Sequence, residues 1–169
     1  MLIQQNIGNA ADIELGNRKI DRLPLEWYEC SKKIQRKKTG GGIEIALKLL
    51  KEGQRLEQDD ILFINDDHAV LVEILPTDAI VITPVDMFEM GRICYEIGNK
   101  HLSLFIQDNK VMIPYEEPIL NWLKATNYDI RIKNIRLLKL LNANVQPHSH
   151  GGPSLFSKIM NLASKQDNS

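Results

Sequence analysis

The order of the secondary-structure elements expected between residues 79 and 137 constrains the fold more than any other feature of the sequence. Apolar alternation and helical periodicity follow one another as strand, helix, strand, strand, helix, strand. This β-α-β-β-α-β order is that of a ferredoxin-like domain. The expected strands cover residues 80–82, 102–106, 110–115 and 128–137, and the expected helices cover residues 87–98 and 117–123.

The first expected helix leads directly to a histidine. Its apolar residues lie on one face at helical spacing: Met90, Ile93, Cys94 and Ile97. Asp86 is placed as N-cap with Glu89 three residues later, close to a capping box. Gly98 and Asn99 are suited to a left-handed C-cap, so we expect the helix to stop there. His101 then lies on a short loop between a packed helix and an apolar strand, as a rigidly placed imidazole.

The first half of the chain predicts a small all-β domain. Short apolar runs alternate there with turn signals, at residues 13–15, 43–47, 61–64 and 69–74. Pro76 cannot donate a ladder hydrogen bond, so we expect the last of these strands to end before it. The predicted fold is therefore α+β. It has an all-β domain over residues 1–75, a ferredoxin-like domain over 76–141 and a flexible tail over 142–169.

A dense basic run lies within the all-β domain, at Lys32, Lys33, Arg36, Lys37 and Lys38. One interpretation is a docking surface for an acidic partner. The other is a solvated edge strand, because lysines at a sheet edge discourage unwanted pairing. The sequence leaves both open.

Composition and missing motifs exclude several classes of function. The formal net charge of −1 argues against a general nucleic-acid binder. No apolar run reaches the length of about 20 residues that a membrane span needs, and the N-terminus has no signal-peptide pattern, so we expect a cytoplasmic protein. The sequence has no nucleophile elbow, zinc-protease motif, P-loop or dinucleotide fingerprint, so we expect no enzymatic activity.

Two further histidines, His148 and His150, lie in the tail beside Gly151 and Gly152. Residues two apart on an extended backbone point the same way, so both imidazoles could reach one ion. Without a cysteine pair, the available nitrogen and oxygen ligands suit Ni²⁺, Zn²⁺ or Cu²⁺. One His101 cannot hold an ion alone. Two copies across a two-fold axis could form half of a site, which the tail histidines would complete.

The segment from Gly91 to His101 resembles the signature of the urease accessory protein UreE family of nickel metallochaperones. That family carries a glycine-asparagine-arginine-histidine motif after a helix, and residues 111–116 are also similar to it. The resemblance implies that His101 is the nickel ligand at a homodimer interface. It also implies that the partners are the urease-assembly GTPase and the urease pre-activation complex. Lys100 departs from the usual arginine, and Ser103 stands where proline is common.

Two other functions compete with a nickel carrier. The first is a protein-interaction module whose β-domain docks a partner while bound metal is incidental. A carrier needs His101 at the symmetry axis, whereas a docking module does not. The second, a metal-dependent hydrolase, lacks a general base near His101.

Overall fold

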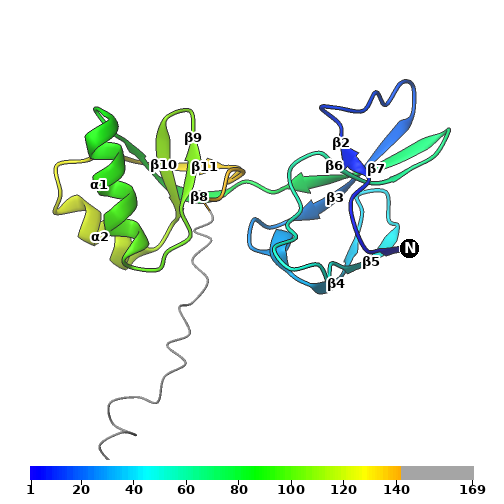
Figure 1. The fold of residues 1–169 in the computed structure, drawn as a ribbon, viewed down its shortest axis with the longest axis horizontal. Coiled ribbons are helices and arrows are strands. Elements are labelled where there is room, and N and C mark those ends of the chain that lie inside the picture. The colour runs from blue at the N-terminus through cyan, green and yellow to red at the C-terminus, as the bar shows by residue number, and fades with distance from the viewer. Residues whose placement is uncertain (142–169) are drawn as a thin grey trace, which may run out of the picture.

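The computed structural model describes residues 1–141, and the predicted tail with His148 and His150 lies outside this range. Figure 1 shows the strands of the first half in one part of the molecule and both helices in the other. The elements in chain order are β1 (Leu2–Ile3), β2 (Gly8–Asn9), β3 (Lys19–Leu25), a 3₁₀ turn (Glu29–Ser31), β4 (Ile34–Lys38), β5 (Glu44–Lys48), β6 (Asp60–Ile64), β7 (His68–Ile74), β8 (Thr77–Thr83), α1 (Met87–Gly98), β9 (Phe105–Gln107), β10 (Lys110–Pro114), α2 (Glu117–Lys124) and β11 (Asp129–Ile135).

The second half has the predicted ferredoxin-like architecture. Its four strands form an antiparallel sheet in the order β11-β8-β10-β9, and α1 and α2 lie on the same side of it (Figure 1). Buried residues of the sheet and both helices share one core, including Ile80, Ile82, Ile93, Ile97, Val111 and Leu123. In the described part of the chain, neither helix is long and apolar enough to cross a membrane.

The β9–β10 hairpin turns at Asp108 and Asn109, as predicted. Both residues have positive φ angles, 49° and 57°, which is the backbone of a tight hairpin turn. The strand before the turn is shorter than expected, however, because it begins at Phe105 and not at Leu102. Leu104 joins the core beneath the helices, whereas Phe105 is buried on the opposite side against Trp27, with ring centroids 5.6 Å apart. The side chains therefore alternate as expected, but both faces of this segment are buried.

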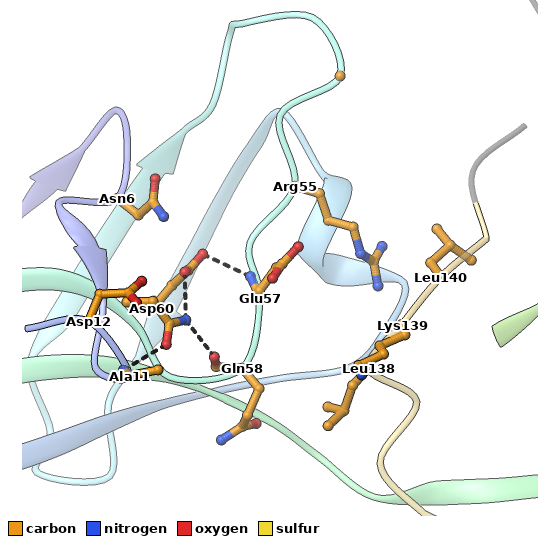
Figure 2. Close-up of a pocket in the computed structure, with 12 residues that line it drawn as sticks. Asn6, Ala11, Asp12, Arg55, Glu57, Gln58, Asp60, Leu138, Lys139 and Leu140 are labelled. Carbon is orange, nitrogen blue, oxygen red and sulfur yellow. Dashed lines mark hydrogen bonds between the residues drawn. The ribbon is translucent and has the colours of Figure 1, made fainter. Parts of the chain in front are cut away.

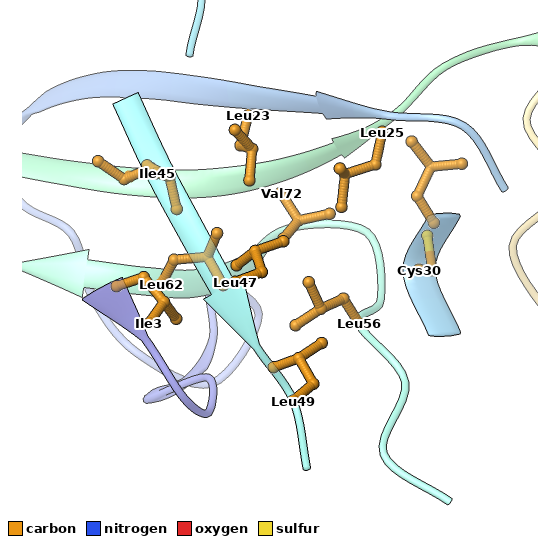
Figure 3. Packing of buried hydrophobic residues seen from close by; sticks show 12 residues of the cluster. Ile3, Leu23, Leu25, Cys30, Ile45, Leu47, Leu49, Leu56, Leu62 and Val72 are labelled. Carbon is orange, nitrogen blue, oxygen red and sulfur yellow. The ribbon is translucent and has the colours of Figure 1, made fainter. Parts of the chain in front are cut away.

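The first half is all-β apart from the 3₁₀ turn, which confirms the prediction. It contains a three-stranded sheet, β1-β5-β4, and a four-stranded sheet, β2-β6-β7-β3. Apolar residues of both sheets fill the space between them, and Figure 3 shows Leu23 and Val72 of one sheet facing Ile45 and Leu47 of the other. All four side chains are essentially inaccessible to solvent.

One predicted strand is wrong. Residues 13–15 form a loop between two turns and no strand, and the strand that pairs with β6 is Gly8–Asn9. The Asn9 side chain accepts a hydrogen bond from the backbone N–H of Ala11 at 3.0 Å, and its carbonyl accepts one from Ile13 at 3.1 Å. These bonds wind the chain into a turn immediately after β2. Ile13 and Leu15 instead pack from outside onto a small core cluster around Ile61.

Candidate metal-binding site

Helix α1 positions the candidate site, and its start is well defined. The Asp86 carboxylate accepts a hydrogen bond from the Glu89 backbone N–H at 2.7 Å, as the sequence predicted. The Glu89 carboxylate in turn accepts from the N–H of Val85 at 2.7 Å, one residue earlier than in a standard capping box. Two backbone donors at the helix start are thereby satisfied.

The predicted apolar face of α1 is confirmed. Ile93 and Ile97 are fully buried, while Met90 and Cys94 pack partly buried against the same core. Burial also raises the pKa of the Cys94 thiol above its ordinary value. The helix therefore packs on the sheet from Met90 to Ile97, and this packing fixes the position of its C-terminal end.

The helix ends differently from the sequence prediction. Neither Gly98 nor Asn99 adopts a left-handed conformation: Asn99 has a φ of −63°, and the left-handed residue is His101, with a φ of 56°. The N–H of Lys100 donates to the Ile97 carbonyl at 3.0 Å, and that of His101 donates to the Gly98 carbonyl at 2.9 Å. These tight i→i−3 bonds extend the last turn and delay the chain reversal until His101. The expected glycine cap is wrong for this reason.

A left-handed histidine is strained, by roughly 1 kcal/mol relative to the usual backbone regions. Contacts on both sides hold it in place. Before it, the Lys100 ammonium lies 4.3 Å from the ring centroid of Trp122 on α2, a cation–π contact. After it, Leu104 is buried in the core. The sequence places Trp122 on the apolar face of the second expected helix but gives no sign that α2 approaches the end of α1.

The outer face of α1 is apolar and uncovered in the single chain. Met87, Phe88 and Tyr95 are 82%, 81% and 71% exposed. A side chain at Gly91 would meet no atom within 4 Å, so the described fold does not require this mid-helix glycine. Sequence reasoning missed this face. Its signal was present, because Phe88 and Tyr95 are seven residues apart and opposite Ile93 and Ile97 on the helix.

His101 is exposed just beyond the end of α1. Within residues 1–141, no group of three or more His, Cys, Asp or Glu side chains could hold a metal ion. His68 is exposed at the start of β7, in the other half of the chain. His148 and His150 lie outside the described residues. Within residues 1–141, His101 therefore belongs to no ready-made set of three or more candidate ligands.

A cavity of about 820 Å³ lies far from His101 in sequence and is shown in Figure 2. Its buried carboxylate, Asp60, accepts hydrogen bonds from the Glu57 backbone N–H at 2.9 Å and the Asn9 amide at 3.1 Å. The same Asn9 amide also donates to the Gln58 carbonyl at 2.9 Å. These bonds hold the loop before β6, so the buried carboxylate has a structural role.

Similarity to known proteins extends over nearly the whole chain. A model of the N-terminal domain of the UreE urease accessory protein matches residues 3–75, and a model of its C-terminal domain matches residues 77–150. A protein of Flavobacterium johnsoniae named urease accessory protein UreE is 48% identical over 164 residues, which are 96% of this chain and 99% of the relative.

More distant relatives carry the same name. The protein of Haemophilus influenzae is 43% identical over 147 residues, covering 85% of this chain and 80% of its own length. That of Acetivibrio thermocellus is 35% identical over 150 residues, covering 89% and 97%. Both domain models and all three relatives describe an accessory protein and not an enzyme. The chain belongs to the UreE family of urease accessory proteins.

Proposed function

We propose that this protein is a cytoplasmic, homodimeric nickel carrier that delivers Ni²⁺ to apo-urease during assembly of the urease active site. The observation that carries the proposal is His101: a strained, exposed imidazole at the end of a helix whose outer face is apolar. Strain retained at an exposed ligand-type residue is typical of a functional position. Family membership supplies the urease context.

A dimer completes the site in this proposal. The exposed side chains of Phe88 and Tyr95 would be covered by α1 of a second copy, and Gly91 would let the two helices approach closely. A two-fold axis near the ends of the two helices brings both His101 imidazoles to one ion. Imidazole nitrogen suits Ni²⁺ and also admits Zn²⁺ or Cu²⁺.

The three segments take separate roles. Residues 76–141 form the metal-binding and dimerisation domain, and residues 1–75 form a partner-docking domain. The tail, 142–169, supplies His148 and His150 as labile ligands that ease release of the ion. The carrier hands nickel to the urease-assembly GTPase and the urease pre-activation complex. Truncation after residue 143 should lower the stoichiometry or affinity for nickel, and unchanged titration curves would remove the tail from the ligand set.

Calorimetric titration with Ni²⁺ and with Zn²⁺, combined with the mass in solution, tests the proposal. We expect a dimer with a high-affinity nickel phase, and loss of that phase in His101→Ala with unchanged circular dichroism. Because protons compete with the metal for imidazole, affinity should also fall on acidification. Equal nickel binding by parent and His101→Ala would leave a protein-interaction module, in which metal is incidental, as the better account.

A further inference from the structure

The outer face of the sheet β1-β5-β4 carries an unusual mixture of side chains. Strand alternation and register place seven residues on this face: Leu2, Ile34, Arg36, Lys38, Glu44, Ala46 and Lys48. The opposite face packs on the core through Ile3, Ile45 and Leu47. Three cations against one anion therefore surround an apolar centre, in a chain whose net charge is only −1.

The basic run seen in the sequence divides into two parts. Lys32 and Lys37 both form ion pairs with Glu29, which is largely buried beneath the sheet. Burial raises the pKa of Glu29, but hydrogen bonds from Lys37, the Glu26 N–H and Lys32 outweigh it and leave the pKa below its ordinary value. These two lysines therefore have a structural role.

The remaining cations lie on the outer face. Among the described residues, Arg36, Lys38 and Lys48 form no salt bridge within 4.0 Å, although Glu44 lies directly across from Lys38. Protection of the β4 edge explains charges on β4. It does not explain Lys48, which is on the central strand, nor Ile34, which is 69% exposed at the edge itself and would favour strand pairing.

The face is also hollowed. A depression of about 460 Å³ lies over the small side chain of Ala46, with Arg36 and Lys38 on one side and Met1 on the other. Leu2, on β1, is 61% exposed and pairs with Ala46 of β5. An apolar side chain can enter such a depression while carboxylates beside it meet the cations.

We propose that this outer face binds an extended, acidic protein segment that carries an apolar anchor. Charge complementarity selects the acidic residues. The depression over Ala46, together with the exposed Leu2 and Ile34 on the same face, selects the anchor. A nucleic acid or an anionic membrane fits less well, because Glu44 lies within the face and its centre is apolar. The inference does not depend on nickel or on His101.

The test is an NMR titration of the ¹⁵N-labelled full chain with a ten-residue peptide of four glutamates and two leucines, flanked by serine and glycine. We expect amide shifts confined to β4, β5 and β1. Arg36→Glu/Lys38→Glu should weaken binding roughly ten-fold. The control Lys124→Glu/Lys133→Glu, with the same charge change on exposed residues of the other half, should stay within about two-fold of the parent.

Several results would overturn the proposal. These are shifts outside the face, equal weakening by both double variants, or equal binding of a peptide with serines in place of the leucines. Tighter binding of phosphatidylserine vesicles or a single-stranded oligonucleotide to the same residues would replace the acidic segment with that ligand. The spectrum of the free double variant reports its fold, and Lys48→Glu repeats the test if that variant is unfolded.

Discussion

Replacing His101 by glycine should make the metal-free protein more stable while removing its metal ligand. His101 has a φ of 56°, a region that costs a residue with a side chain roughly 1–2 kcal/mol and costs glycine little. Glycine also has more conformational freedom in the unfolded chain, which cancels about 0.5–1 kcal/mol of this gain in stability. Because the lost imidazole is exposed, few contacts disappear, and the net gain should be about 0.5–1 kcal/mol.

A matched control isolates the backbone effect. Ala125 is the C-cap residue of α2 and, like His101, is exposed close to a helix end, but its φ is −78°. Ala125→Gly relieves no strain and should destabilise the protein by about 0.5–1 kcal/mol. Both variants and the parent are compared by urea unfolding without metal, at one protein concentration because a dimer's stability depends on it. A less stable His101→Gly, or shifts of the same sign in both variants, would refute the account of a strained ligand.

Three further predictions concern the surroundings of the site and the core of the first half. Trp122→Leu removes the ring beneath Lys100 and should weaken nickel binding about 2–5-fold in calorimetry, whereas an unchanged affinity would deny Trp122 a positioning role. Gly91→Ala should raise the stability of the metal-free single chain by up to about 1 kcal/mol but weaken the dimer in sedimentation, and an equally tight dimer would place the interface elsewhere. Glu29 has a lowered pKa, so its stabilisation is present above its ordinary pKa of 4.5 and is lost as pH falls through the folded value. Glu29→Gln should therefore destabilise the protein at pH 7 and progressively less as the pH falls below 4.5, and a loss in urea unfolding that stays constant over this range would contradict the ion-pair account.

The second half of the fold could be predicted because its signals are local. The Asp86 cap, the turn at Asp108 and Asn109, and the helical spacing of Ile93 and Ile97 each act within a few residues. Such signals specify the type and order of elements without knowledge of distant contacts. The ferredoxin-like order follows from that sequence of elements.

The first half resisted prediction in detail because its pairings join distant segments. The parallel pair of β3 and β7 aligns Lys19 with His68, and β1 pairs in parallel with β5, about 44 residues further along the chain. Apolar alternation shows that a strand exists but does not name its neighbour. Residues 13–15 were misjudged for a related reason, since two apolar side chains, Ile13 and Leu15, can pack on a core from a loop.

The candidate site was predicted only in part. The position of His101 between a helix and an apolar strand marked it as a candidate ligand. The left-handed residue was expected at Gly98 or Asn99, because these residue types adopt that backbone most readily. It is His101 instead, because two tight turns extend the end of the helix before the chain reverses. The contact between Lys100 and Trp122 depends on the packing of two helices. Completion of the site by a second chain remains a prediction that no single chain can test.

Native mass spectrometry of the nickel-loaded protein tests the central claim most directly, because it counts ions on each assembled species. The claim is that one ion is held between the His101 imidazoles of two chains. At limiting nickel we expect the tightly bound ion on the dimer and none on the monomer. We also expect a His101→Ala dimer without that ion. Nickel on monomers, or equal loading of parent and His101→Ala dimers, would contradict the shared site.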